Sequence, residues 1–337
     1  MPGAPQPVVE MLWEPHDPHE TLRERFGFRA PASAGRWIAA TVNTHWDAQI
    51  EAVERIVISH TNALAWLASS SGDRLIAKWS VATDTFASLS RVSRFTHWLH
   101  VNGLPVSAPL PSLAGCLQVE TEKVSMCLQR VVEGDLLDVD DLDQVRAAGQ
   151  VLARLHHALT DYPRHDHILP AYARPQPLAA RIASWLNSAG PHVPDAGRTA
   201  LRSLVQDAPT TPLPVQLVHG DFRSSNIVCV GSRIAAVIDF ESARLDHCAD
   251  ELARSAVLLG TRFRDWGPVS PEVRATFLAG YESERALTPV EQYWWNALVL
   301  WYTLAFVPPG DDPTGWGSSA LGQLAALQPI VSAVGQV

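Results

Sequence analysis

Three polar residues in the segment LVHGDFRSSNIVCVGSRIAAVIDFE are of types that bind a metal ion and handle a proton. They are Asp221, Asn226 and Asp239. Mg²⁺ accepts carboxylate and amide oxygens, and it takes its remaining ligands from water and substrate phosphates. Asn226 and Asp239 are therefore candidate Mg²⁺ ligands. Asp221 is then left for proton chemistry.

The apolar runs around these residues predict the strands that must position them. One run ends at Val218 and leads into a polar loop, and the runs 227–230 and 234–238 flank a Gly-Ser turn. Such a hairpin brings Asp239 back towards Asn226, although the two are well separated in the sequence.

The HGDFRSSN segment followed by IDFE resembles the catalytic loop and the metal-binding motif of the aminoglycoside phosphotransferase and choline kinase-like family. Members of this family are small-molecule kinases with a protein-kinase-like fold. The resemblance implies that Asp221 is the catalytic base that orients the acceptor hydroxyl. It also implies that Asn226 and Asp239 bind Mg²⁺ and that His219 supports the loop. In phosphoryl transfer, catalysis is mostly positioning and charge neutralisation.

Other residues near these motifs are candidate contacts. Arg223 and Ser224 lie inside the loop, where they are placed to touch phosphate or acceptor, and Asp246 is a candidate acceptor contact. Glu241 replaces the glycine of a protein kinase DFG motif, which makes protein kinase activity a minor alternative. The resemblance implies that Asp250 ties the next helix to the catalytic loop by hydrogen bonds.

Lys78 is one of only two lysines in the chain, the other being Lys123. In the predicted strand RLIAKWS its side chain lies on the opposite face from Leu75 and Ala77. The resemblance implies that Lys78 binds the α and β phosphates of the nucleotide. The alternative is an edge-strand lysine that discourages aggregation.

Three apolar runs, at 56–59, 63–68 and 75–79, predict a small antiparallel sheet around Lys78, with further strands at 115–119 and 124–131. The loop between the first two runs holds Thr61 and Asn62, which resemble the polar pair that often stands there in the family. This loop lacks the glycines that allow backbone amides to approach phosphate closely.

The helix expected at about 84–102 contains no glutamate, whereas the family usually pairs the strand lysine with one. Asp84 is a candidate substitute. Together with the glycine-poor loop, this departure motivates an alternative, a non-catalytic nucleotide- or metabolite-binding kinase homologue. The intact Asp221, Asn226 and Asp239 argue against that alternative.

The predicted fold is α+β, a two-lobed protein-kinase-like fold with a small antiparallel N-lobe sheet and a larger, mainly helical C-lobe. Residues 1–54 form an N-terminal helical extension, with helices at about 19–26 and 34–46. This extension caps the acceptor site, stabilises the small lobe or mediates dimerisation. Residues 55–133 form the nucleotide-binding N-lobe, and residues 134–337 form the catalytic and acceptor-binding C-lobe.

Several helices are expected in the C-lobe. Aspartates around position 141 mark the start of a long amphipathic helix that contains His156, which we interpret as a core histidine. Two helices are expected within 178–204, where this family often builds its acceptor pocket. The apolar stretch 293–307 is shorter than the ~20 residues that span a bilayer. It is predicted to be a buried helix.

Composition excludes some classes of function. The 337 residues carry a net charge of −9 without a basic tract, which disfavours nucleic-acid binding. The four cysteines form no CxxC pair and fall mostly in apolar segments, which is typical of buried thiols in a cytoplasmic protein. No signal peptide or membrane span is predicted.

The sequence thus predicts an ATP- and Mg²⁺-dependent kinase that phosphorylates a hydroxyl group of a small molecule. An aminoglycoside-type antibiotic, a sugar, an amino alcohol and homoserine all remain open as acceptors. The residues do not separate ATP from GTP, and they do not indicate an oligomeric state.

Overall fold

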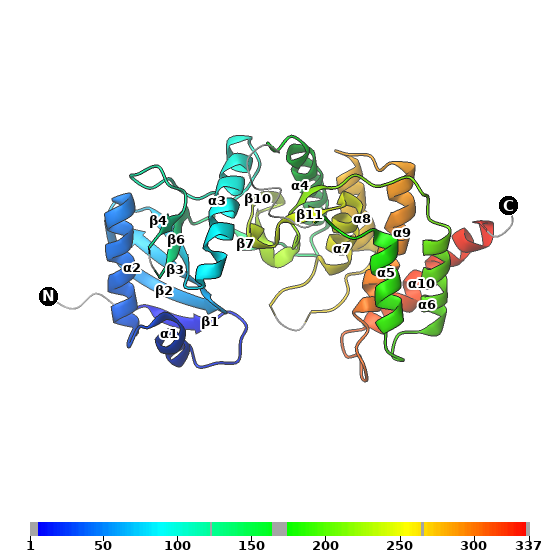
Figure 1. The fold of residues 1–337 in the computed structure, drawn as a ribbon, viewed down its shortest axis with the longest axis horizontal. Helices are drawn as coiled ribbons and strands as arrows, with labels where there is room; N and C mark the ends of the chain where they lie inside the picture. Colours follow the sequence, from blue (N-terminus) through cyan, green and yellow to red (C-terminus); the bar gives the residue numbers. More distant parts are fainter. Residues whose placement is uncertain (1–5, 122, 164–173, 264–265, 335–337) are drawn as a thin grey trace. The chain divides into compact units, whose positions relative to one another are not determined.

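The computed structural model describes residues 6–121, 123–163, 174–263 and 266–334. The chain divides into two compact units, Met1–Glu133 and Gly134–Val337. The first combines a sheet with three helices, and the second is mainly helical (Figure 1).

The first unit contains a six-stranded sheet in the order β1-β2-β3-β4-β6-β5. Its strands are β1 (Val8–Met11), β2 (Ile50–Ser59), β3 (Asn62–Ser69), β4 (Arg74–Ser80), β5 (Val119–Glu120) and β6 (Ser125–Arg130). All neighbours are antiparallel except β1 and β2, which are parallel. The expected small antiparallel sheet is confirmed. Strand β1 and the early start of β2 were not expected from the sequence.

The N-terminal helices α1 (Pro18–Phe26) and α2 (Pro31–Trp46) pack against this sheet. Leu22, Ile38 and Val42 are fully buried with the inward side chains of the strands. The first 54 residues therefore supply core helices and an edge strand to the small unit. Of the three roles open for this segment, the structure supports stabilisation of the small lobe.

Residues after β4 form a short 3₁₀ turn, η1 (Thr83–Thr85), and then helix α3 (Phe86–Val101). Asp84 lies exposed in that turn. Cys116, which was expected to be buried, is exposed, whereas the other three cysteines are buried and none of the four is paired.

The second unit has seven helices within its described residues: α4 (Leu142–Thr160), α5 (Leu178–Ser188), α6 (Asp195–Gln206), α7 (Cys248–Leu258), α8 (Pro271–Glu282), α9 (Pro289–Ala305) and α10 (Trp316–Val334). Its short strands form two small sheets. One has the order β10-β9-β7 and the other pairs β11 with β8. Their bounds are β7 (Asp135–Leu136), β8 (Gln216–Val218), β9 (Ile227–Val230), β10 (Arg233–Val237) and β11 (Arg244–Asp246).

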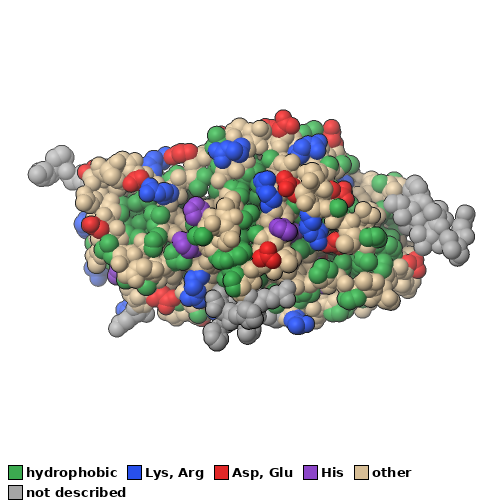
Figure 2. Space-filling view, turned by 90° about the horizontal axis from the view of Figure 1, so that it is seen from above, with side chains coloured by type: hydrophobic (Ala, Val, Ile, Leu, Met, Phe, Trp, Pro, Cys, Tyr) green, Lys and Arg blue, Asp and Glu red, His purple; other side chains and the backbone are tan. Residues whose placement is uncertain are grey.

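The aromatic helix α9 lies in the core of this unit, as the sequence predicted. Its residues Ala297 to Leu304 are buried against α5, α6, α7 and α10. Among the described residues, no helix is long and apolar enough to cross a bilayer. On the face shown in Figure 2, basic and acidic side chains are interspersed.

Helices α4 and α8 approach each other closely at two glycines. A Cβ atom at Gly149 would lie 2.1 Å from the Phe277 carbonyl oxygen, and one at Gly280 would lie 2.2 Å from the Arg146 carbonyl oxygen. Both clashes involve backbone atoms, which cannot rotate away. The two positions therefore fix the distance between the helices.

We expect Gly149→Ala to destabilise the protein by about 1–3 kcal/mol, because an extra methyl group overpacks this contact. Gly322→Ala on α10 is the matched control. Its Cβ would meet nothing within 4 Å, and a helical alanine there should stabilise by about 0.4–1 kcal/mol. Urea unfolding of the two variants measures the difference. Equal effects would mean that the α4–α8 contact does not limit stability.

Candidate functional site

The loop after β8 and the β9–β10 hairpin bring the two candidate metal ligands to one place. Val237 pairs with Ile227 in the hairpin, and the Ile238 N–H donates to the Asn226 carbonyl oxygen at 2.9 Å. Asp239 follows directly. Asn226 and Asp239 thus lie at the same end of the hairpin, as the sequence predicted.

Asp221 is the most heavily contacted polar residue of the loop. Its Oδ2 accepts hydrogen bonds from Arg223 Nε and from Asn226 Nδ2, both at 3.0 Å. Asn226 Nδ2 also donates to the Asp221 carbonyl oxygen at 2.8 Å, and Arg254 Nη2 lies 3.9 Å from Asp221 Oδ1. These contacts fix the direction of a half-buried carboxylate.

The same contacts leave an oxygen available at Asn226. Its amide nitrogen is used by Asp221, and within the described residues its Oδ1 accepts no hydrogen bond. Asp239 is exposed and has a left-handed backbone with φ of 63°, a conformation that costs free energy in a non-glycine residue. An amide oxygen and an exposed carboxylate suit Mg²⁺, which needs only a few protein ligands.

His219 holds the loop in place through both ring nitrogens. Nε2 donates to the Ile238 carbonyl oxygen at 3.0 Å, and Nδ1 accepts from the Asp221 N–H at 3.1 Å. The neutral tautomer with the proton on Nε2 satisfies both bonds. The ring also lies 4.4 Å, centroid to centroid, from Phe240. His219 therefore links the loop to the end of the hairpin and does not face solvent.

Gly220 is required by space and by backbone conformation. Its φ is +85°, and a Cβ there would lie 2.1 Å from the Ser242 carbonyl oxygen. The Gly220 carbonyl oxygen accepts hydrogen bonds from Arg244 and Arg254. These two arginines were not identified from the sequence, because arginine is common throughout this chain.

Glu251, near the start of α7, accepts the N–H groups of the two residues before Asp221. One carboxylate oxygen accepts from the His219 N–H at 3.1 Å and the other from the Gly220 N–H. His156 Nε2 lies 2.8 Å from Glu251 Oε2, and His156 Nδ1 lies 2.7 Å from the Tyr281 hydroxyl. His156 is a core histidine, as expected, and it connects α4 and α8 through Glu251 to the loop that carries Asp221.

The expectation that Asp250 ties α7 to the loop is wrong by one residue. Asp250 instead accepts hydrogen bonds from Arg181 Nη2 at 3.0 Å and from the Tyr302 hydroxyl at 2.9 Å. Successive residues of a helix point about 100° apart, so only one of the adjacent acids Asp250 and Glu251 faces the loop.

Two candidate contacts are buried and bonded within the protein. Asp246 is 2% exposed and binds Arg181 Nη1 at 2.9 Å and Arg244 Nε at 3.1 Å. Ser224 is 1% exposed, and its hydroxyl donates to the Thr261 carbonyl oxygen. In this structure the side chains of both residues are used within the protein. Glu241 is exposed beside Asp239, and Arg223 is half-buried.

The pKa values of the buried Glu251–His156 pair are shifted in opposite directions. Burial raises the pKa of Glu251, but the hydrogen bond and charge of His156 and the hydrogen bond from the Gly220 N–H lower it to about 2. Burial lowers the pKa of His156, but its interactions with Cys248, Tyr281 and Glu251 raise it well above the ordinary value of 6.5. We infer a charged pair at neutral pH.

The candidate nucleotide residues Lys78, Thr61 and Asn62 lie in the first unit. Lys78 is on β4, on the sheet face opposite the buried Leu75 and Ala77, as the strand pattern predicted. The β2–β3 connection is a tight turn rather than a long loop, since Ser59 pairs with Asn62. It carries Thr61 at its tip.

This turn is braced by the N-terminal segment. The His60 N–H donates to Glu14 Oε2 at 3.1 Å, and Arg25 Nη1 donates to the His60 carbonyl oxygen at 3.0 Å. Glu14 is 8% exposed. Side chains from residues 1–54 thus hold a turn that in this chain has no glycine.

Comparison with known sequences defines the class of protein. A sequence model of the phosphotransferase enzyme family matches residues 52–293, and the chain belongs to this family. It is 29% identical over 160 residues to the homoserine kinase of Methylorubrum populi, across 48% of this chain and 49% of that one. It is 26% identical over 193 residues to the homoserine kinase of Methylobacterium radiotolerans, across 57% and 59%. The chain spans about half the length of these curated relatives.

Solved structures show the same protein-kinase-like fold. An amicoumacin kinase, in complex with AMP-PNP and Ca²⁺, superposes with a TM-score of 0.55 at 14% identity over 92% of this chain and 96% of that one. A choline kinase from Cryptosporidium parvum superposes with a TM-score of 0.52 at 11% identity over 89% and 97%. The two-lobed kinase-like fold class expected from the sequence is confirmed.

We expect Glu251→Gln to lower the free energy of unfolding by about 3–5 kcal/mol at pH 5 to 6, because it leaves a buried charge unpaired. The ionised Glu251 contributes its full stabilisation above pH 4.5, the ordinary pKa of a glutamate. This contribution is lost as the pH falls towards 2, the pKa of Glu251 in the folded protein. The protonated His156 contributes its full stabilisation below pH 6.5, the ordinary pKa of a histidine. This contribution is lost as the pH rises through the raised pKa of His156 in the folded protein. The difference between wild type and variant should therefore be largest between pH 4.5 and 6.5.

Urea unfolding across the pH range measures this difference. The control is Glu282→Gln, which removes an exposed carboxylate from the end of α8 and should change little at any pH. A Glu251→Gln effect that does not vary with pH would contradict a charged Glu251–His156 pair.

Proposed function

We propose that the protein is an ATP- and Mg²⁺-dependent phosphotransferase that phosphorylates a hydroxyl group of a small molecule. One observation carries the proposal: the fixed Asp221 carboxylate and the Asn226 amide share a loop, and Asp239 stands at the adjoining hairpin end. Membership of the phosphotransferase enzyme family supports it.

Asp221 is the residue that handles the proton. Its Oδ2 is held by Arg223 and Asn226, so the carboxylate keeps one direction while it accepts a hydrogen bond from the acceptor hydroxyl. As the acceptor oxygen forms its bond to the γ-phosphorus and the bond to the ADP oxygen breaks, the hydroxyl proton passes to this carboxylate. Pre-orientation of this kind lowers the entropic cost of reaching the transition state.

Asn226 Oδ1 and the Asp239 carboxylate are the residues that would hold the metal. Bound Mg²⁺ neutralises negative charge on the β and γ phosphates. Lys78, with Thr61 and Asn62 at the β2–β3 turn, would bind the nucleotide. The solved relatives in complex with ADP, GDP and AMP-PNP support nucleotide binding in general terms.

The acceptor is a small molecule with a free hydroxyl group. The curated relatives are named homoserine kinases, while solved structures of the same fold include phosphotransferases of spectinomycin and macrolides. Homoserine is therefore the first acceptor to test, followed by aminoglycosides, macrolides, sugars and amino alcohols.

We expect ADP release from Mg-ATP with one acceptor of this panel, and a loss of about 10²–10⁴-fold in kcat for Asp221→Asn, the contribution typical of a positioned general base. Asp311→Asn is the matched control, since Asp311 is exposed and remote in sequence from the site. A coupled assay of ADP formation measures both. Unchanged turnover in Asp221→Asn would remove Asp221 from the mechanism.

The panel also separates the proposal from its alternative. A non-catalytic nucleotide- or metabolite-binding homologue would bind Mg-ATP and release no ADP with any acceptor. Isothermal titration with a non-hydrolysable ATP analogue distinguishes that result from a protein that binds no nucleotide.

The two lysines of the chain provide a matched pair for the nucleotide site. We expect Lys78→Ala to raise the KM for ATP by about 10–100-fold, because it removes a charge-assisted bond worth roughly 1.5–3 kcal/mol. Lys123→Ala removes an exposed lysine of the same unit and should leave KM unchanged. Equal effects of the two substitutions would indicate that Lys78 acts only through general surface charge.

A further inference from the structure

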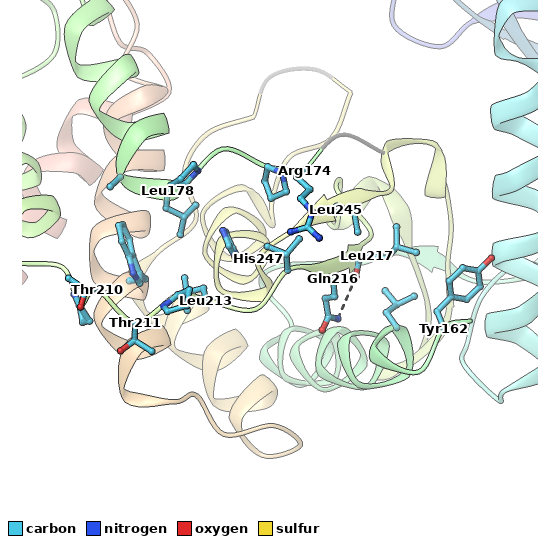
Figure 3. Close-up of a pocket in the computed structure, with 18 residues that line it drawn as sticks. Tyr162, Arg174, Leu178, Thr210, Thr211, Leu213, Gln216, Leu217, Leu245 and His247 are labelled. Atoms are coloured by element: carbon cyan, nitrogen blue, oxygen red, sulfur yellow. Dashed lines mark hydrogen bonds between the residues drawn. The ribbon is translucent and has the colours of Figure 1, made fainter. Parts of the chain in front are cut away.

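A large cavity lies in the second unit, apart from the residues assigned to catalysis. It has a volume of about 1030 Å³ and is bounded by the end of α4, the start of α5, α9 and the β8–β11 ribbon (Figure 3). Asp221, Asn226 and Asp239 are not among its lining residues. A volume of this size accommodates a drug-sized molecule.

The β8–β11 ribbon forms one wall of the cavity. Val218 of β8 pairs with Arg244 at the end that leads to Asp221, whereas Gln216 pairs with Asp246 at the opposite end. Gln216 and His247, the residue after Asp246, line the cavity. Leu217 and Leu245, the middle pair of the ribbon, also line the cavity, so its wall begins two residues before His219.

His247 supplies a hydrogen-bond acceptor inside the cavity. It is 8% exposed, and its Nδ1 lies 3.0 Å from the Pro214 carbonyl oxygen. A carbonyl oxygen only accepts, so Nδ1 carries the proton, and Nε2 of the neutral ring keeps its lone pair. Within the described residues Nε2 has no partner, and Figure 3 shows the ring at the cavity wall.

The other polar groups at the cavity define its charge preference. Arg174 lines it and has no ion pair with any described residue, while the Gln216 side chain is already used by the His156 carbonyl oxygen and Thr160. Among the described residues that line the cavity, none is Asp or Glu. The remaining wall is largely proline, leucine and Trp294. Such a lining disfavours a polycation and suits an apolar body with an anionic group.

We propose that this cavity is a second small-molecule site. It takes a mostly apolar ligand with a hydroxyl or N–H group that donates to His247 Nε2 and an anionic group that pairs with Arg174. The occupant contacts Gln216 and Leu217 of β8, the strand that leads into the catalytic loop. The site is separate from the nucleotide and from the transferred phosphate.

The probe for this site is 6-(p-toluidino)-2-naphthalenesulfonate, which has an apolar ring system, one N–H donor and a remote sulfonate. Its fluorescence rises when it leaves water, so titration of the whole chain gives a dissociation constant and a stoichiometry. We expect saturable binding of one probe per chain that Mg-ATP does not displace.

Three substitutions test where the probe binds. Thr211→Phe, at an exposed loop position on the cavity wall, should weaken binding at least about tenfold, which corresponds to about 1.4 kcal/mol. Thr199→Phe, at an exposed α6 position outside the cavity, should leave it unchanged. His247→Asn keeps a donor for Pro214 and removes Nε2, and should weaken binding about three- to tenfold, as expected for one lost hydrogen bond.

Other outcomes would overturn the proposal. Equal binding by wild type and Thr211→Phe would place the probe elsewhere, and so would equal weakening by Thr211→Phe and Thr199→Phe. Displacement of the probe by Mg-ATP in a one-to-one manner would place it at the nucleotide site. Circular dichroism of each variant checks the fold, and Thr211→Phe keeps the test decisive if His247→Asn does not fold.

Discussion

The loop that carries Asp221 depends on one buried carboxylate. Glu251 accepts the N–H groups of His219 and Gly220 while it pairs with His156, so the two peptides before Asp221 cannot turn without leaving a buried charge unsatisfied. Arg244 and Arg254 donate to the Gly220 carbonyl oxygen, which belongs to the following Gly220–Asp221 peptide. The position of Asp221 is thus set by backbone contacts on both sides, and its own side-chain contacts only adjust its direction.

The same hydrogen bonds join three helices of the second unit. His156 comes from α4, Tyr281 from α8 and Glu251 from α7. The close approach of α4 and α8 at Gly149 and Gly280 brings the first two together. Helix packing and loop geometry therefore meet in one hydrogen-bond network, in which His156 joins α4 and α8 to Glu251.

Local features of the site were predictable from the sequence, and long-range ones were not. The hairpin that joins Asn226 to Asp239 and the sheet face of Lys78 follow from short-range alternation and a Gly-Ser turn.

Strand β1 pairs in parallel with β2 across two helices, and a run of four residues carries no signal for such a partner. The assignment of Asp250 failed because adjacent acids on one helix differ only in direction, which depends on tertiary packing. The arginines that bind the Gly220 carbonyl oxygen have no sequence mark among so many arginines.

The N-terminal helices determine where the chain can be truncated without loss of the core of the first unit. The family match begins at residue 52, inside β2, which starts at Ile50. A fragment cut at that point would lose Leu22, Ile38 and Val42 from the core and would present the apolar face of its sheet to water, where such faces associate with other chains. For expression and engineering, the smallest self-contained form of the first unit is longer than the part of it that the family match covers.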